Sequence, residues 1–250
     1  MKNFKRILTL MFHRVNDVSI GFDPAKFERY LDYLVNHFPI VLPGEDLKSK
    51  TAVCLTFDDA YYDFYHHVFP LLQKYNVKAL LAVPVGYIKD DTDVSPEIRL
   101  SVPYVKGMED PSYASKTPFC TFKELREMAH SGLVDIASHG YLHQNLAKDD
   151  ADFSQEIVLS KKILQDKLDT PVTNFVYPYG RMSKHAHNLV CQHYTFGIRI
   201  GSALNIGWDF SNRFVYRINA DPLWTKYKPI SAMLLNKLTL KYWGNRIRSK

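Results

Sequence analysis

Short apolar runs alternate with longer helix-like stretches along most of this 250-residue chain, and this alternation constrains the fold more than any other feature. Strands that alternate with helices pair in parallel, which predicts an α/β fold. Seven strand candidates in one domain predict a barrel rather than an open sheet. The candidates are Ile7–Phe12, Val53–Phe57, Ala79–Val83, Leu133–Ala137 and Phe175–Tyr177, with weaker patterns at Thr195–Ile200 and Phe214–Ile218.

Helix signals lie between these runs. Asp23 before Pro24 is typical of an N-cap followed by the first helical residue, and helical apolar spacing continues from there. A capping box opens the helix predicted over Thr121–Ser131. Two further helices are predicted over Phe64–Tyr75 and Phe153–Leu168.

The stretch from Lys89 to Pro118 interrupts the alternation. It holds four prolines together with clustered aspartates and serines. Long irregular segments inside a compact domain are usually functional or disordered. We interpret this one as an excursion near the active face, with a flexible surface loop as the equal alternative.

The net charge of +6 comes from the C-terminal end of the chain. Residues 226–250 hold seven of the 32 lysines and arginines and no acidic residue, which leaves 25 basic against 26 acidic residues in the rest. A near-neutral body offers no basic groove, so no nucleic-acid partner is expected. We therefore divide the chain into a barrel over residues 1–225 and a basic, partly apolar tail over residues 226–250.

The tail mixes apolar and basic residues at roughly helical spacing. A segment of this kind can lie on an anionic membrane surface. The equal alternative is a helix that packs on the barrel and leaves a solvated basic end. A membrane contact would make a lipid-linked sugar an attractive substrate.

Basic residues before Ile7–Phe12 resemble the start of a signal peptide, but the run stops at His13 and no small-residue cleavage site follows. We expect the first strand there, and a cytoplasmic protein that is peripheral at the inner membrane face if the tail binds lipid. No eighteen consecutive apolar residues occur, so no transmembrane helix is expected. The three cysteines include no close pair, which argues against a disulfide framework and mildly for a reducing compartment.

Two adjacent carboxylates, Asp58 and Asp59, follow the second apolar run. Neighbouring residues of a strand point to opposite faces, so both can serve one site only if the strand ends there and the chain turns. The run ends at Phe57 and helix-like residues follow, which supports such a turn. Catalytic residues of barrels gather at C-terminal strand ends, although an isolated Asp-Asp pair is more often a solvated turn or a helix cap.

Two histidines four positions apart, His139 and His143, follow the fourth run. In an extended strand they would lie ~13 Å apart, too far to share one ion. In a helical turn their Cβ atoms would lie roughly 6 Å apart, which allows a common metal, and Gly140 permits the change of backbone direction. One carboxylate and two imidazoles make a three-ligand set that suits a borderline divalent metal and leaves positions for water and substrate.

A third motif, Tyr177-Pro178-Tyr179-Gly180, follows the fifth run. Pro178 and Gly180 predict a tight turn at which a backbone N–H could face the metal. Taken alone, the motif would be interpreted as an ordinary strand-to-loop turn.

With these three motifs in this order, the chain resembles the polysaccharide deacetylases, the carbohydrate esterase family 4 or NodB-like domain. Thr56-Phe57-Asp58-Asp59 is similar to the family's first motif, His139–His143 to its second and Tyr177-Pro178-Tyr179-Gly180 to its third. The resemblance spans nearly the whole chain, from about residue 7 to residue 221. It implies a distorted (β/α)7 barrel in a single domain and hydrolysis of an N-acetyl, less often an O-acetyl, group on a sugar.

The resemblance also implies roles for individual residues. Asp59, His139 and His143 would bind one divalent metal ion, with Zn²⁺ favoured and Co²⁺ or Ni²⁺ as alternatives. Asp58 would be the general base that deprotonates the water activated by the metal. The metal and the backbone N–H of Tyr179 would stabilise the tetrahedral oxyanion.

Two departures from the family pattern assign roles to residues near the ends of the chain. The usual general acid, a histidine in a C-terminal Leu-x-His motif, is missing. Circularly permuted members of the poly-N-acetylglucosamine deacetylase type carry this histidine on the first strand. His13 follows a run that resembles that strand, so the resemblance implies that His13 is the general acid. The motif-three arginine is also missing, and Arg217 from the last strand would supply that charge and favour ionised Asp58. A surface arginine without a partner is the equal alternative. Ala60 replaces the common glycine of the first motif, and Gly140 replaces the usual Ser or Thr of the second.

Other function classes compete with this interpretation. Two histidines and a carboxylate also form the non-haem Fe(II) facial triad, but that site expects an all-β, cupin-like fold. A non-catalytic carbohydrate-binding barrel would leave Asp58 dispensable, and an O-deacetylase of the same fold would hydrolyse an ester instead. We predict a metal-dependent carbohydrate de-N-acetylase that acts on an N-acetylated sugar of a polysaccharide or lipid-linked glycan of the cell envelope. The sugar, its carrier and the oligomeric state stay open.

Overall fold

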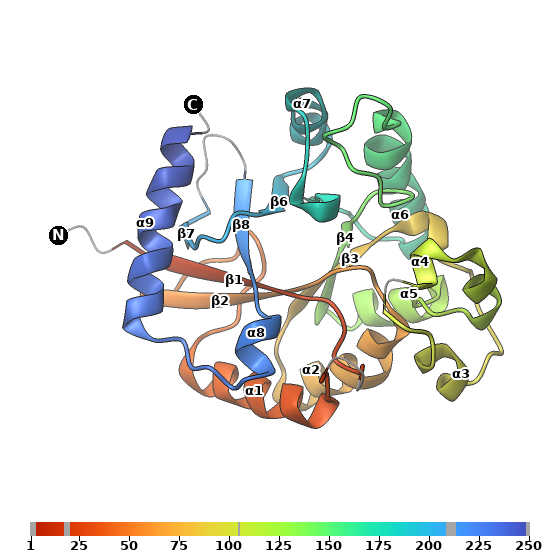
Figure 1. Ribbon diagram of the computed structural model, residues 1–250, viewed down its shortest axis with the longest axis horizontal. Helices are drawn as coiled ribbons and strands as arrows, with labels where there is room; N and C mark the ends of the chain where they lie inside the picture. The colour runs from red at the N-terminus through yellow and green to blue at the C-terminus, as the bar shows by residue number, and fades with distance from the viewer. Residues whose placement is uncertain (1–3, 18–20, 105, 209–213, 249–250) are drawn as a thin grey trace.

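Seven parallel strands close into a barrel in the computed structural model, which describes residues 4–17, 21–104, 106–208 and 214–248 (Figure 1). The ring order is β2-β3-β4-β5-β6-β8-β1, and a β1–β2 pairing closes it. A further short strand, β7, pairs antiparallel with β1. The bounds are β1 Arg6–Phe12, β2 Thr51–Phe57, β3 Ala79–Val83, β4 Val134–Ser138, β5 Asn174–Val176, β6 Phe196–Ile200, β7 Asn205–Ile206 and β8 Phe214–Asn219. The predicted (β/α)7 barrel is confirmed, and an all-β, cupin-like fold is excluded.

Pairing around the ring is uneven, which is the distortion expected of this barrel. β1 and β2 are in register over seven residue pairs, from Arg6↔Thr51 to Phe12↔Phe57. β4 and β5 are joined by one pair, Ser138↔Phe175. All ring strands nevertheless run in the same direction, so their C-terminal ends meet at one rim.

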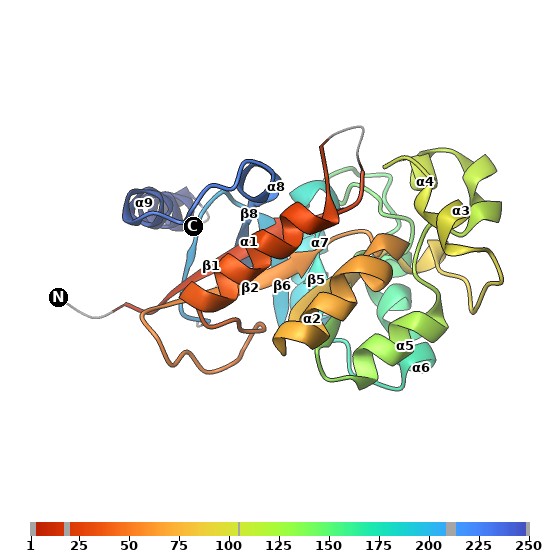
Figure 2. The same ribbon diagram turned by 90° about the horizontal axis from the view of Figure 1, so that it is seen from below.

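Helices surround the ring on its outside (Figures 1 and 2). They are α1 Pro24–His37, α2 Phe69–Tyr75, α3 Pro96–Leu100, α4 Lys106–Glu109, α5 Phe122–His130, α6 Ser160–Leu168, α7 Lys184–His193, α8 Asp221–Trp224 and α9 Ala232–Arg248. The four predicted helices form, and two of them begin with a π-helical turn, Phe64–Val68 before α2 and Ser154–Leu159 before α6. The helix α7 was not among the predicted ones.

Local signals define where two of the helices begin, as predicted. The Asp23 carboxylate accepts the N–H of Ala25 at 2.8 Å and caps α1. Thr121 and Glu124 form both halves of the capping box of α5. Each cap satisfies N–H groups that the first helical turn leaves without an intrahelical partner.

Apolar side chains fill the barrel on both faces of the strands, which explains why the strands read as continuous apolar runs. The larger cluster lies between strands and helices; in it Phe12 and Phe57 stack with ring centroids 5.0 Å apart, and Phe27 of α1 packs edge-on against both. A smaller cluster takes side chains from five ring strands and fills the interior: Leu80, Ala82, Ala137, Val176, Ile198 and Val215. The rigid ring that results holds the strand ends in fixed positions.

The excursion between Lys89 and Pro118 forms short helices, α3 and α4 among them, beside the rim. The buried Arg99 ties it down by a bidentate ion pair to Glu124, with nitrogen–oxygen distances of 2.6 and 2.8 Å. Tyr104 of the excursion lines the cavity that holds the candidate site residues. The predicted position near the active face is confirmed.

The tail packs on the outside of the barrel as α9, beside β1, β7 and β8 (Figures 1 and 2). Leu238 and Tyr242 turn inward and are buried, and the Tyr242 ring contacts that of Tyr216 on β8. Asn245 donates a hydrogen bond to the carbonyl of Gly201 at 3.0 Å. The packed helix that we considered for the tail is therefore formed. Among the described helices, none has the length and apolar content that crossing a membrane requires.

Candidate active site

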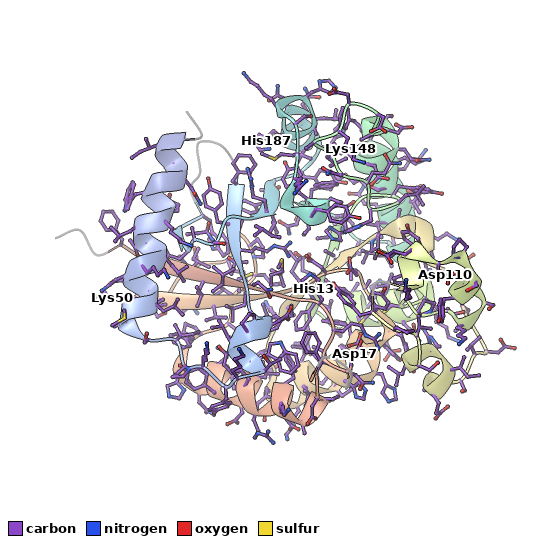
Figure 3. All side chains as sticks on the ribbon, viewed as in Figure 1. His13, Asp17, Lys50, Asp110, Lys148 and His187 are labelled. Atoms are coloured by element: carbon purple, nitrogen blue, oxygen red, sulfur yellow. The ribbon has the colours of Figure 1, made fainter. Side chains whose placement is uncertain are left out.

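The predicted site residues meet at the C-terminal rim of the barrel. His13 directly follows β1, Asp58 and Asp59 follow β2, and His139 follows β4. Arg217 lies in β8, the neighbour of β1 in the ring. Figure 3 shows His13 near the middle of the molecule, where these strands end. Barrels collect catalytic residues at this rim because several strands deliver side chains to it at once.

Asp58 and Asp59 face one cavity because the backbone turns sharply after β2. Asp59 and Ala60 have φ angles of 73° and 51°, both in the left-handed region. That region costs a residue with a Cβ roughly 1 kcal/mol, so the glycine that the resemblance implies for this position would be less strained there than Ala60. The predicted turn at the end of the strand is confirmed.

His139 and His143 also meet through a turn, but it is not helical, so that part of the prediction is wrong. The chain leaves strand geometry at Gly140, with φ 85°, as predicted, and His143 has φ 57°. No helical residue lies between the two histidines. Their Nε2 atoms nevertheless lie 3.2 Å apart.

Asp59, His139 and His143 form a triangle of potential metal ligands. The Oδ1 atom of Asp59 lies 3.6 Å from the Nε2 atom of each histidine, and the two Nε2 atoms are 3.2 Å apart. Ligands about 2.1 Å from a tetrahedral ion lie about 3.4 Å apart, so the triangle fits one small divalent ion. The buried Asp59 Oδ1 atom has no hydrogen-bond partner among the described residues, as expected for an atom that needs a cation.

The ligand nitrogens are set up to carry lone pairs toward the triangle. His139 Nδ1 lies 2.8 Å from the carbonyl oxygen of Val176, to which it donates, and this leaves Nε2 free to bind. Burial, together with the neighbouring His139, lowers the pKa of His143 to about 3, so its imidazole is neutral. Burial raises the pKa of Asp59. A cation bound at the triangle would lower that pKa again, because it stabilises the ionised carboxylate.

Asp58 and Arg217 form a buried, bidentate ion pair. The guanidinium Nη1 and Nη2 atoms lie 2.6 and 2.8 Å from the two carboxylate oxygens. Burial alone would raise the pKa of Asp58, but Arg217, with help from His139 and His13, holds it well below its ordinary range. The predicted ion pair is thus formed, and the alternative of an unpartnered surface arginine is wrong. Asp58 is oriented and ionised beside the ligand triangle, with its Oδ2 atom 4.0 Å from His139 Nε2.

His13 is held by a carboxylate that the sequence analysis did not identify, Asp221. The Nδ1 atom of His13 lies 3.3 Å from Asp221 Oδ2. Burial alone would lower the pKa of His13, but Asp221, with the charges of Asp58 and Asp59, raises it to about 9. The sequence could have indicated Asp221, because it is an acidic residue two positions after the last strand, and the end of that strand lies at the same rim.

Glu156 is the second functional residue that the sequence analysis missed. Its fully buried carboxylate accepts the backbone N–H groups of Tyr141, Leu142 and Gln144 at 3.0, 2.7 and 3.2 Å. A Cβ at Gly140 would come within 2.1 Å of Glu156 Oε2, so glycine is required there. Glu156 therefore fixes the loop that carries His143, and it does so from a π-helical turn, a feature often found at functional sites.

Glu156→Gln should weaken metal binding about tenfold or more, because the glutamine NH₂ group would oppose backbone N–H donors and loosen the His143 loop. The dissociation constant for Co²⁺ or Zn²⁺, measured by titration of the metal-free chain, checks this. Glu127→Gln is the matched control, since that exposed carboxylate accepts the Tyr65 hydroxyl and lies outside the cavity that holds the ligands. An unchanged dissociation constant in a folded Glu156→Gln protein would contradict the assignment.

The ligands, Asp58 and His13 line one inner cavity of about 200 Å³, together with aromatic rings that include Tyr61 and Tyr104. The cavity adjoins a groove of about 1000 Å³ whose lining includes Lys148, labelled in Figure 3. The site therefore has a small, aromatic inner part and a wide outer part.

The turn of the third motif stands where the inner cavity meets the groove. Pro178 is buried and Tyr179 has φ 58°, so the predicted tight turn is confirmed. The Tyr179 side chain is 60% exposed, and its ring centroid lies 4.6 Å from that of His143. An oxyanion contact through the Tyr179 backbone N–H stays a prediction.

A family model described as polysaccharide deacetylase matches residues 46–195, more than half of the chain. The matched range contains the three ligands and Asp58, whereas His13 and Arg217 lie outside it. This division agrees with a permuted strand order, in which the first and last strands supply the remaining site residues.

Two curated relatives match parts of the chain. Poly-beta-1,6-N-acetyl-D-glucosamine N-deacetylase of Escherichia coli K12 is 41% identical over 96 residues, which are 38% of this chain and 12% of that protein. The YxkH protein of Bacillus subtilis 168 is 26% identical over 186 residues, 70% of this chain and 57% of that protein. The chain thus matches only part of each relative's length.

Solved structures share the fold at low identity. The Streptococcus pyogenes deacetylase PplD superposes with a TM-score of 0.70 at 20% identity, covering 94% of this chain and 99% of that one. IcaB from Ammonifex degensii superposes with a TM-score of 0.66 at 20% identity, covering 92% and 97%. The fold, the rim site and the family match agree with the predicted resemblance, and the chain belongs to the polysaccharide deacetylase family.

Proposed function

We propose that this chain is a metal-dependent hydrolase that removes the N-acetyl group from an amino sugar of a polysaccharide or lipid-linked glycan. The observation that carries the proposal is the ligand triangle of Asp59, His139 and His143 in one cavity with Asp58 and His13. A divalent ion held by this donor set, with Zn²⁺ favoured, would act as a Lewis acid on the amide carbonyl and on water. The protein residues supply the proton transfers.

Asp58 is proposed as the general base. Its carboxylate takes a proton from the water that attacks the acetyl carbon. The bidentate contact with Arg217 fixes both carboxylate oxygens and keeps the group ionised over the neutral pH range. A carboxylate buried without such a partner would have a raised pKa and could be protonated at neutral pH.

His13 is proposed as the general acid. Asp221 holds its Nδ1 atom, which leaves Nε2 as the nitrogen that can give a proton to the departing amine. The C–N bond then breaks, acetate forms, and the sugar leaves as a free amine. The backbone N–H of Tyr179 is proposed as a donor to the oxyanion that develops on the acetyl oxygen.

The two cavities indicate how a glycan would sit. A cavity of about 150 Å³ accommodates benzene, so the inner cavity of about 200 Å³ has room for one six-membered ring. The outer groove would hold the adjoining sugars or the carrier. The name of the E. coli relative supports β-1,6-linked N-acetylglucosamine as the first polymer to test.

Acetate release from N-acetylated oligosaccharides, measured with the metal identified by elemental analysis, tests the proposal. We expect release that chelation with EDTA abolishes and Zn²⁺ or Co²⁺ restores, because the triangle is the group of metal-ligating side chains found among the described residues and the ion it holds would be the Lewis acid. Polymer, lipid-linked and nucleotide sugars in the same assay identify the carrier.

Matched O-acetylated substrates separate the alternatives. Because an ester is intrinsically easier to hydrolyse than an amide, the result that would favour an O-deacetylase of the same fold is release from the ester with no release from the matched N-acetyl sugar. Sugar binding without acetate release from any substrate would identify a carbohydrate-binding barrel and overturn the proposal.

A further inference from the structure

The helix α9 presents an apolar stripe to solvent. Met233, Leu240, Trp243 and Ile247 are 83, 74, 46 and 74% exposed. Their spacings of seven, three and four residues place them on one side of a helix with 3.6 residues per turn. We call these four side chains the α9 stripe.

The stripe is held outward because the opposite side of α9 is fixed to the barrel. Leu238 and Tyr242 are 5 and 4% exposed and belong to the main apolar core. The hydrogen bond from Asn245 to the Gly201 carbonyl fixes the helix near its C-terminal end. Rotating the stripe inward would expose these anchors, so its exposure is a stable property of the fold.

The charged residues of α9 itself all carry the same sign. Lys237 and Lys241 are exposed along one flank of it, about 40° and 80° from Met233 around the helix axis. No acidic residue follows Asp221 anywhere in the chain. The surface that covers the stripe must therefore accept apolar side chains and carry negative charge beside them.

We propose that the α9 stripe binds the surface of an anionic lipid bilayer. The 17-residue helix would lie in the membrane plane over about 25 Å, with the stripe in the headgroup layer and the lysines at lipid phosphates. Trp243 suits this depth because its ring is amphipathic. A second copy of the chain fits less well, since two stripes face to face would bring like-charged flanks together.

Co-sedimentation of the full chain with vesicles tests the inference. We expect binding to phosphatidylcholine vesicles that contain 30% phosphatidylglycerol, and weak binding to phosphatidylcholine alone. Lys237→Gln/Lys241→Gln should weaken binding about 25-fold, because each surface lysine contributes about fivefold. Leu240→Gln/Ile247→Gln should weaken it at least as much, since both side chains are lost from the apolar layer.

Lys162→Gln/Lys184→Gln is the matched control, because it removes the same charge from the exposed lysines of α6 and α7. Equal weakening by this pair, or no preference of the wild type for anionic vesicles, would overturn the inference. Light scattering that shows a dimer lost in Leu240→Gln/Ile247→Gln would assign the stripe to a second copy instead. Acetate release from a short water-soluble substrate should be unchanged in all three variants, so the result does not depend on the proposed activity.

Discussion

Asp58→Asn should lower acetate release about a thousandfold or more while the chain keeps its metal. A general base contributes about a hundred- to ten-thousandfold to rate, and asparagine cannot take up the proton. Asp58 is not part of the ligand triangle, and its nearer oxygen lies 4.0 Å from His139 Nε2. The measurements are the initial rate of acetate release and the metal content after dialysis.

The substitution also removes the ion pair with Arg217 and leaves one of its two hydrogen bonds. An amide offers one acceptor where the carboxylate offers two, so a guanidinium that is 1% exposed keeps its charge without a full partner. Removing one member of a buried pair costs on the order of 3 kcal/mol of folding free energy. Assays should therefore be run well below the lowered melting temperature, which thermal unfolding measures.

Asp59→Asn is the matched control, because it is the same chemical change one residue along the chain. It should lose both metal and activity, since Asp59 is a corner of the ligand triangle. Full acetate release by the Asp58→Asn protein would show that Asp58 is not the general base. Loss of metal in both proteins would instead make Asp58 part of the metal site.

The fold could be predicted because its signals are local. Most ring strands are buried on both faces and so appear as apolar runs in the sequence, whereas β6, whose pattern is weaker, is partly exposed. The rim then follows from topology, since parallel strands end together. Asp58, Asp59 and His139 were predictable as neighbours because each directly follows such a run.

The supporting carboxylates could not be predicted in the same way. Glu156 lies on a helix and reaches the His143 loop through three backbone N–H groups, an arrangement that leaves no side-chain pattern in the sequence. Asp221 contacts His13 across 208 positions of the chain. Such contacts become visible only when the ring is closed and β8 lies beside β1.

The turn between His139 and His143 shows that a correct argument about their distance can still predict the wrong backbone conformation. The distance requirement excluded a strand but did not require a helix. A buried carboxylate at Glu156 replaced the helical hydrogen bonds and required glycine at position 140. The departure from the family pattern at Gly140 thus has a structural cause that lies outside the motif.

His13→Gln should lower release of acetate from an N-acetyl sugar about a hundred- to ten-thousandfold, with normal metal content. The amine must be protonated to leave, and the proposed donor is His13. With a pKa of about 9, His13 is protonated at neutral pH and loses its proton as the pH rises through about 9. Wild-type activity should therefore fall on the alkaline side.

Asp221→Asn should move that alkaline limit to lower pH, because it removes the carboxylate that stabilises the charged imidazole. A cation at the triangle would shift the limit in both proteins in the same direction, so the difference between them is the quantity to measure. The folding stability that the His13–Asp221 pair contributes also decreases as the pH rises. It is fully present below pH 6.5 and is lost as the pH rises through about 9.

A substrate with a good leaving group distinguishes the role of His13 as general acid from that of Asp58 as general base. An aryl acetate ester releases a phenolate that needs no proton, so His13→Gln should slow its hydrolysis far less than it slows that of the amide. Asp58→Asn should slow both, because water must lose a proton in either reaction. Equal losses on ester and amide in the His13→Gln protein would show that His13 positions the substrate or the cavity wall. A selective loss on the amide is the result that only a proton donor explains.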